Sequence, residues 1–349
     1  MKAVRMYAPL DLRVEEVDKP NCGADECLVK IMAVGICGSD IPRCTKFGAH
    51  VSPIIPGHEF GGIIEEVGSE VNNFNVGDHV TCPPLIPCGK CEYCQMGEYS
   101  LCEDYDYYGS RRDGAFAQYL SVNQGNLLKV DNSVSYEDAA TVDPCANALH
   151  GMRRGEFKPG DSVAVFGAGP IGLFAILYAK LQGASKIFAV DMWEEKLELA
   201  KKNGADVVIN SKNTEAAQAI LDATDGLGVD VAIDFSGAPI CQKAAIRAAA
   251  KLGRVVYLGI SHKELILAEN ELDMVLRKQL SIKGSWNSFG KPFPGSDWTD
   301  SVDMFENAGM TAKNIISHRL DLDDAPDIFN KIAEGGMYFS KIMFYPNGK

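Results

Sequence analysis

The 349-residue sequence has no run of 18 or more uninterrupted apolar residues, which excludes the usual pattern of a membrane-spanning helix. Basic residues are also few: 34 Lys and Arg stand against 47 Asp and Glu, and the formal net charge is −13. A protein that binds nucleic acid needs a basic surface for the phosphate backbone, so this balance argues against such a partner. We therefore expect neither a membrane nor a nucleic-acid partner.

A signal peptide and a repeat are also missing. Residues 1–5 lead directly into alternating, strand-like sequence and contain no apolar signal-peptide core. The chain has no internal repeat, and 46% of its residues are apolar, which is ordinary for a globular protein. At roughly 100–200 residues per domain, the length suggests two domains. We therefore expect a cytoplasmic globular protein with a sizeable core.

Short strand-like runs separated by turn residues fill residues 1–150. From about residue 155 to residue 285, apolar runs alternate with helical spacing, which predicts a parallel sheet of right-handed βαβ units. Irregular, Gly/Pro-rich sequence returns near Ser285, before one amphipathic helix predicted over residues 323–334. The predicted strands cover residues 27–34, 61–67, 78–82, 163–166, 186–190, 207–209, 229–235 and 254–259, and the other predicted helices cover residues 172–182 and 194–203.

A glycine-rich turn follows the predicted strand at residues 163–166 and precedes a predicted helix. In the pattern G-x-G-x-x-G, the first glycine allows a tight turn, the second lets the backbone approach a pyrophosphate, and the third lets the helix pack closely on the sheet. The helix N-terminus adds free N–H groups and a positive dipole end. We therefore predict that a dinucleotide binds at Gly167, Gly169, Pro170, Ile171 and Gly172.

The choice between NAD and NADP depends on Asp191, nineteen residues after Gly172. This spacing suits a carboxylate that accepts hydrogen bonds from the adenosine ribose. A 2′-phosphate beside the carboxylate would be repelled, and the next residues, Met192 and Trp193, offer no arginine to receive it. We therefore predict NAD as the cofactor.

Four of the eleven cysteines crowd into fifteen residues, at Cys88, Cys91, Cys94 and Cys102. Without a secretion signal, such a cluster indicates metal binding more than a disulfide framework. Four thiolates in one short loop are typical of a closed, tetrahedral structural zinc site. An iron–sulfur cluster is the chemical alternative.

A second group of possible ligands is dispersed along the chain, at Cys37, His58, Glu59 and Asp143. One cysteine, one histidine and one carboxylate, with a position left open, fit a catalytic zinc. Taken singly, a buried cysteine or histidine is more often part of a packed core than a metal ligand.

Together, these segments resemble the zinc-containing medium-chain alcohol dehydrogenase family over essentially the whole chain. The resemblance implies an α/β fold with two parts. A GroES-like β-barrel catalytic domain, with a structural zinc lobe, would comprise residues 1–150 and the returning segment 286–349. A Rossmann domain, a doubly wound parallel sheet that binds NAD, would comprise residues 151–285. The resemblance also implies two zinc ions per chain, one catalytic and one structural, and a homodimer or homotetramer.

The resemblance assigns roles around the catalytic zinc. Cys37 and His58 would be ligands, Glu59 a ligand or a swinging group beside the metal, and Ser39 the hydroxyl that relays the alcohol proton. Asp143 stands where polyol members of the family usually carry glutamate. Because its side chain is one methylene shorter, it would bind zinc through a water or after a shift of its loop.

Four stretches resemble the polyol branch of the family most closely: residues 37–43, 47–50, 109–114 and 284–287. They imply oxidation of a secondary alcohol of a phosphorylated polyol to a ketose, above all galactitol 1-phosphate to tagatose 6-phosphate, in carbohydrate metabolism. An unphosphorylated, sorbitol-like polyol and a threonine-like substrate are alternatives, and a non-catalytic binding protein on the same fold is a remote one. The candidate substrate contacts are Arg43, Lys46, His50, Arg111, Arg112, Trp286 and Asn287.

Overall fold

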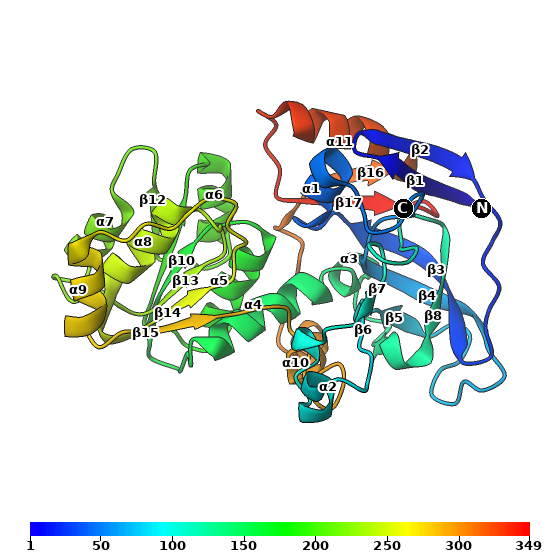
Figure 1. Ribbon diagram of the computed structural model, residues 1–349, viewed down its shortest axis with the longest axis horizontal. Coiled ribbons are helices and arrows are strands. Elements are labelled where there is room, and N and C mark those ends of the chain that lie inside the picture. Colours follow the sequence, from blue (N-terminus) through cyan, green and yellow to red (C-terminus); the bar gives the residue numbers. More distant parts are fainter. The chain divides into compact units, whose positions relative to one another are not determined.

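The computed structural model describes all 349 residues, which form two compact units (Figure 1). The first unit contains Met1–Asp143 and Ser288–Lys349, and the second contains Pro144–Asn287. The first unit is therefore built from two stretches that are far apart in the sequence. The domain limits predicted after residues 150 and 285 stay a prediction, and helix α4, Val142–Arg154, continues through the first of them.

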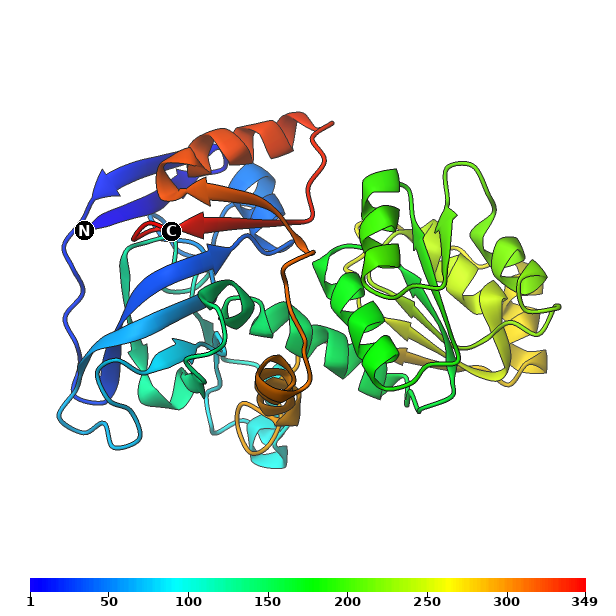
Figure 2. The ribbon, with the colours of Figure 1, turned by 180° about the vertical axis from the view of Figure 1, so that it is seen from behind.

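A seven-stranded sheet forms the centre of the first unit. Its strands are β3 (Glu26–Gly35), β4 (Glu59–Val67), β5 (His79–Thr81), β8 (Tyr119–Asn123), β9 (Leu128–Val130), β16 (Ile316–Asp321) and β17 (Lys341–Tyr345). The order is β16-β17-β3-β4-β5-β9, and β8 pairs with β3. Strand β17 is parallel to β16 and antiparallel to β3. It thereby joins the C-terminal stretch to the N-terminal stretch in one sheet (Figure 2).

Shorter elements surround this sheet. They are β1 (Lys2–Ala8), β2 (Asp11–Glu16), α1 (Asp40–Pro42), η1 (Arg43–Phe47), β6 (Leu85–Ile86), α2 (Glu92–Met96), η2 (Tyr99–Leu101), β7 (Asp106–Tyr107), η3 (Gln124–Asn126), α3 (Tyr136–Ala139), α10 (Ser296–Asn307), η4 (Leu322–Asp324) and α11 (Ala325–Glu334). Apolar residues of β1, β3 and β4 share one buried core with α11. The helix predicted over 323–334 begins as the separate turn η4, and α11 starts at Ala325 because Pro326 fits the first turn of a helix.

The second unit is a six-stranded, fully parallel sheet. Its strands are β10 (Ser162–Phe166), β11 (Lys186–Asp191), β12 (Val207–Asn210), β13 (Val229–Asp234), β14 (Ala249–Tyr257) and β15 (Ser281–Gly284), and its further helices are α5 (Pro170–Leu181), α6 (Glu194–Lys202), α7 (Ala216–Asp222), α8 (Pro239–Ala248) and α9 (Glu269–Arg277). The order β12-β11-β10-β13-β14-β15 reverses direction between β10 and β13. Helices α5 and α6 cover one face, and α7 and α8 cover the other (Figures 1 and 2).

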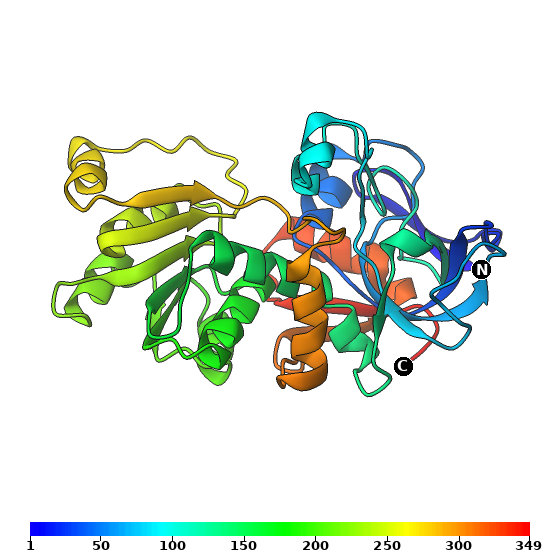
Figure 3. The ribbon, with the colours of Figure 1, turned by 90° about the horizontal axis from the view of Figure 1, so that it is seen from below.

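The predicted alternation of strands and helices in this unit is confirmed. Most predicted limits agree within two residues, but β14 begins at Ala249 instead of Arg254, because its pairing with β13 is irregular at that end. Strand β15 forms one edge of the sheet, and α9 leads into it (Figure 3). None of the helices combines the length and the apolar composition that crossing a lipid bilayer requires.

Candidate active site and metal centres

The antiparallel pairing of β3 and β4 brings three of the predicted zinc ligands together. Gly35, at the end of β3, pairs with Glu59, at the start of β4. Cys37 comes shortly after the end of β3 and His58 directly before β4, so the two residues lie next to these paired strand ends. One donor atom each from Cys37, His58 and Glu59 lies within 4.8 Å of the other two. Zinc binds thiolate, imidazole and carboxylate donors at about 2.0–2.3 Å, so donors at this mutual spacing fit a single zinc ion.

Close backbone packing fixes the turn before His58. Gly57 has a φ of +91°, a left-handed conformation that favours glycine. Gly109 and Gly114 pack against it, and Cβ atoms at these two positions would lie 2.5 and 2.1 Å from the Gly57 carbonyl oxygen. Larger residues would push the segments apart. The glycines therefore hold His58 beside the turn that carries the two predicted arginines.

Asp40 is a buried site residue that sequence reasoning missed, although it lies only three residues after Cys37. Its carboxylate accepts hydrogen bonds from the Cys37 N–H at 3.0 Å and from Arg43 at 2.8 Å, and it lies 3.5 Å from His58 Nδ1. Although burial opposes its charge, His58 and Arg43 lower the pKa of Asp40. Burial would also lower the pKa of His58, but Asp40 and Cys37 raise it well above its ordinary value. The same negative potential favours a bound metal cation.

Lys341 was also missed, because it lies 282 residues from its partner, Glu59. It is the first residue of β17, and its ammonium group, almost fully buried, binds the Glu59 carboxylate and donates to the Ile36 carbonyl at 3.0 Å. Gly35 leaves the room for this pair, since a Cβ atom there would lie 2.8 Å from a Glu59 oxygen. Lys341 therefore fixes one oxygen of the carboxylate that stands beside the predicted metal position.

Asp143 and Ser39 complete the predicted catalytic residues. Asp143 lies in the first turn of α4, and its carboxylate is outside the 4.8 Å group of three. Burial raises the pKa of Asp143 to about 7, and the charge of Glu59 adds to the shift while that of His58 opposes it. Ser39 precedes α1, and its hydroxyl makes no capping hydrogen bond to that helix.

Tyr107 is a third residue that sequence reasoning missed. Its ring packs edge-on against the His58 ring, with centroids 5.4 Å apart and planes at 74°. Burial raises the pKa of Tyr107 well above its ordinary value, and Asp143 and Cys37 act in the same direction. The hydroxyl therefore stays protonated, close to the predicted zinc-ligand group of Cys37, His58 and Glu59.

The four clustered cysteines form a separate group, with all four sulfur atoms within 4.8 Å of one another. Backbone N–H groups point at these sulfurs: Cys88 donates to Cys102 Sγ at 3.3 Å, Cys91 to Cys88 Sγ at 3.4 Å, and Cys94 to Cys91 Sγ at 3.5 Å. The N–H groups of Cys94 and Glu103 lower the pKa of Cys91 to about 6. Four converging sulfurs, with N–H groups that stabilise thiolates, fit a tetrahedral zinc ion.

The predicted basic contacts fall into distinct environments. The Arg111 guanidinium lies 4.4 Å from the centre of the Tyr105 ring, forms no ion pair, and has a buried Nε without a hydrogen-bond partner. Burial, and then the positive charges of Arg111 and Arg43, lower the pKa of His50, so these three residues share one region. Arg112 differs, because its Nε is paired with Asp106 at 2.7 Å.

The three other predicted contacts have different surroundings. Lys46 is exposed, and its ammonium group lies 5.0 Å from the centre of the Phe47 ring. Trp286 and Asn287 belong to the second compact unit, where Trp286 is half exposed and Asn287 has a φ of +53°.

The glycine turn after β10 has the geometry that a dinucleotide site needs. Gly167 has a φ of +99°, and a Cβ atom on Gly172 would lie 2.0 Å from the Gly167 carbonyl oxygen. Beside Gly169 there is open space within 4 Å, so the backbone can approach a pyrophosphate closely.

Asp191, at the end of β11, accepts hydrogen bonds from the N–H groups of Ala168 at 2.9 Å, Met192 at 2.7 Å and Trp193 at 3.1 Å. These bonds hold the carboxylate at the edge of the glycine turn. A cavity of about 300 Å³ is lined by Val190, which directly precedes Asp191, by residues 211–216, and by Ile240 and Cys241. The second unit thus carries a fixed carboxylate next to an open cavity, as an adenosine site requires.

Comparisons with known proteins agree with this arrangement. Residues 23–132 match the family model of the alcohol dehydrogenase GroES-like domain, and residues 170–307 match that of the zinc-binding dehydrogenases. The chain belongs to the zinc-dependent medium-chain alcohol dehydrogenase family, a class of NAD(P)-binding oxidoreductases. The predicted α/β fold, with a GroES-like domain and a Rossmann sheet, is confirmed.

Within this family, the chain is similar to several polyol and amino-alcohol dehydrogenases. It is 35% identical to galactitol 1-phosphate 5-dehydrogenase of Escherichia coli strain K12, covering 92% of this chain and 93% of the relative. It is 32% identical to sorbitol dehydrogenase of Bacillus subtilis strain 168 (99% and 98%), and 37% identical to L-threonine 3-dehydrogenase of Pyrococcus horikoshii (77% and 78%).

Two solved structures superpose over nearly the whole chain. The crystal structure of galactitol-1-phosphate dehydrogenase from Escherichia coli gives a TM-score of 0.94 at 35% identity, covering 99% of this chain and 100% of the other. A zinc-binding dehydrogenase from Sinorhizobium meliloti 1021, bound to NADP, gives 0.91 at 31% identity, covering 99% of both chains.

Proposed function

We propose that this protein oxidises a secondary alcohol of a polyol to a ketose, with NAD⁺ as the hydride acceptor and a zinc ion at Cys37, His58 and a neighbouring carboxylate. The observation that carries this proposal is the convergence of three different donors within 4.8 Å, beside a buried, charged Asp40. A fold alone does not need such a group, so its presence argues against a non-catalytic protein.

Different residues of the first unit would have different roles around the substrate. A zinc ion bound there would act as a Lewis acid that favours deprotonation of the substrate hydroxyl, and NAD⁺ would accept the hydride. The Ser39 hydroxyl is not used to cap α1 and would relay the substrate proton toward solvent. Pro42 stands where simple alcohol dehydrogenases often carry a histidine, so no imidazole would take part in this relay. Asp40 fixes the Cys37 backbone, and Lys341 holds Glu59.

NAD is favoured over NADP by the position of Asp191. Three backbone N–H groups hold its carboxylate at the glycine turn, where it would accept hydrogen bonds from the ribose and repel a 2′-phosphate. The Sinorhizobium meliloti neighbour is bound to NADP, so the fold itself does not exclude NADP. The choice in this chain therefore depends on the carboxylate.

A phosphorylated polyol is the substrate that the basic residues favour, and galactitol 1-phosphate, giving tagatose 6-phosphate, is the specific proposal. In a chain with a net charge of −13, Arg111 has no acidic partner and shares its region with Arg43 and His50. A guanidinium held by an aromatic ring, with free N–H groups, is well suited to a phosphate. Arg112 is already neutralised by Asp106 and contributes less.

The test is NADH formation by the zinc-loaded protein with galactitol 1-phosphate, galactitol, sorbitol and L-threonine measured under the same conditions. A higher kcat/KM with the phosphorylated substrate is the expected result. Equal or faster turnover of the free polyols would overturn the phosphate assignment in favour of a sorbitol-like enzyme, and turnover of threonine alone would make it an amino-alcohol dehydrogenase. Two bound zinc ions without any turnover would contradict the polyol assignment itself.

The protein is further proposed to assemble as a homodimer, or as a tetramer of two dimers, through β15. This edge strand leaves backbone N–H and C=O groups unpaired, and its Ile282 is 38% exposed. Helix α9, which leads into β15, exposes Leu272 and Leu276. A second copy of the same edge would extend the sheet and cover these side chains.

A further inference from the structure

Tyr107 is held rigidly at the site by its backbone. It ends β7, which pairs with β6 through Leu85. Its carbonyl oxygen accepts hydrogen bonds from the N–H groups of the next turn, including that of Arg111 at 3.0 Å. Gly109, inside this turn, packs on the Gly57 backbone, so the turn that carries Tyr107 and Arg111 lies against the segment that carries His58.

The Tyr107 ring is fixed as well. One contact is the edge-on packing against His58, at 5.4 Å, and another is a similar contact with Tyr105, at 6.2 Å and 74°. Tyr105 in turn faces the Arg111 guanidinium. The three side chains therefore form one row that starts at the zinc-ligand group and ends at the unpaired arginine.

The hydroxyl of Tyr107 has no protein partner. The ring is half-buried, yet the oxygen is not sealed from solvent and forms no hydrogen bond with any protein group. Buried tyrosines usually direct their hydroxyl to a partner. Because the Tyr107 ring packs edge-on against the His58 ring, the hydroxyl belongs to the region where the reacting alcohol would bind.

We propose that Tyr107 is a specificity-determining residue, whose hydroxyl donates a hydrogen bond to a second substrate hydroxyl on the carbon next to the one that is oxidised. This inference rests on the proposed polyol oxidation and specifies it: the substrate class is a vicinal diol. A monohydric alcohol would leave the Tyr107 hydroxyl without a substrate partner, which disfavours such a substrate. In the row from Tyr107 to Arg111, Tyr107 would then bind a substrate hydroxyl near the metal, and Arg111 would bind the anionic group of the substrate farther away.

The test compares Tyr107→Phe with the wild-type zinc-loaded protein on galactitol 1-phosphate, sorbitol and 2-butanol. Phenylalanine keeps the ring contacts and removes only the hydroxyl. We expect kcat/KM to fall about tenfold for the two polyols, the effect of one hydrogen bond, and to stay within about twofold for 2-butanol. Tyr7→Phe, which removes a hydroxyl bonded to Glu15 on the β1–β2 hairpin, is the matched control and should change neither.

Binding provides the second readout. Isothermal titration of the same three alcohols into the zinc-loaded protein with NADH measures Kd without turnover, and Tyr107→Phe should weaken only the polyols. If the wild type binds polyols and oxidises none, the proposed function fails while the Tyr107 effect is still measured. Equal losses for 2-butanol and the polyols would assign Tyr107 a structural role. Unchanged polyol values, or a wild type that binds no polyol, would overturn the inference.

Discussion

At the scale of single residues, two adjacent arginines in one turn have different surroundings. Arg111 has a buried Nε without a partner and faces Tyr105, whereas Arg112 is paired with Asp106. An arginine without a counter-charge is poised to receive an anion, and a paired arginine is not. The sequence Arg111-Arg112 offers no sign of this difference, which depends on how the turn packs.

Replacing these arginines one at a time therefore separates their roles. Arg111→Ala should lower kcat/KM for galactitol 1-phosphate by about 10–100-fold, because charge-assisted hydrogen bonds to the phosphate are lost. The kcat/KM for galactitol should change by less than about twofold. Arg112→Ala is the matched control and should change the ratio between the two substrates less than about twofold. Equal effects of both variants on that ratio would contradict the assignment of the phosphate to Arg111.

The buried pair of Lys341 and Glu59 leads to a prediction for stability. Lys341→Met removes the positive partner and leaves a buried carboxylate, which typically costs about 3–5 kcal/mol. Urea denaturation should reveal this loss, with Lys349→Met, an exposed lysine eight residues later, as the control that changes little. A loss below about 1 kcal/mol, the size typical of an exposed pair, would contradict the view that this buried ion pair stabilises the fold.

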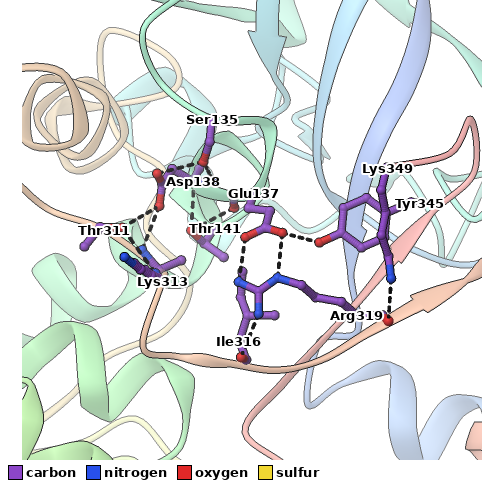
Figure 4. A network of polar contacts seen from close by, with 11 residues as sticks. Ser135, Glu137, Asp138, Thr141, Thr311, Lys313, Ile316, Arg319, Tyr345 and Lys349 are labelled. Carbon is purple, nitrogen blue, oxygen red and sulfur yellow. Dashed lines mark hydrogen bonds and ion pairs between the residues drawn. The ribbon is translucent and has the colours of Figure 1, made fainter.

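At the scale of elements, helix α3 is tied to the C-terminal stretch by two acidic residues (Figure 4). Glu137 accepts two hydrogen bonds from the Arg319 guanidinium, both at 2.8 Å, and one from the Tyr345 hydroxyl. Asp138 accepts from the Ala312 N–H at 2.7 Å. These contacts connect α3 with β16 and β17, and β17 also carries Lys341, the partner of Glu59.

The stability that Glu137 contributes should depend on pH. The bond with Arg319, despite an opposing effect of burial, lowers the pKa of Glu137 in the folded protein. A lowered folded pKa means that the contribution is complete above the unfolded value, about 4.3, and is lost as pH falls through the folded value. Glu137→Gln should therefore be less stable than wild type by about 1 kcal/mol at pH 7, and the gap should be smaller at pH 3. Urea titrations at both pH values measure this gap, and a constant gap would rule out the carboxylate charge as its source.

The sequence predicted local elements well, because strands such as β10 and β11 are recognised from short apolar runs followed by glycine or aspartate. It also predicted Cys37, His58 and the four-cysteine loop as metal ligands, and the structure brings each set together. It could not predict Lys341 or Tyr107. The position of each depends on strand pairing and on turn packing between distant segments, and neither has a local spacing that indicates a partner.

At the scale of the whole molecule, the two predicted zinc ions should be separable. Cys94→Ser removes one sulfur of the four-cysteine group, so we expect about one zinc per chain instead of about two, together with a lower melting temperature. Mass spectrometry of the metal content measures the number. Cys241→Ser, in the second unit and outside both metal groups, is the control that should keep both ions. One bound zinc ion per chain in the wild-type protein would contradict the assignment of two zinc ions.

The proposed oligomer is tested at the β15 edge. Ile282→Lys adds a charge to this strand and should shift the protein toward the 37.8 kDa monomer in analytical ultracentrifugation. Leu227→Lys, which changes an exposed leucine outside β15 and α9, is the matched control and should leave the assembly unchanged. A wild type that already sediments as a monomer, or an unchanged Ile282→Lys variant, would remove β15 from the interface.

The first unit is built from two separate stretches, and this constrains the order in which its parts can fold during translation. Because β17 lies between β16 and β3, the central sheet stays incomplete until residues 288–349 have been synthesised. The second unit, made in between, has its whole parallel sheet available earlier and can fold while translation continues. Glu59 therefore lacks its partner Lys341 until after the whole second unit has been synthesised, and the proposed metal site is completed only when both stretches of the first unit are present.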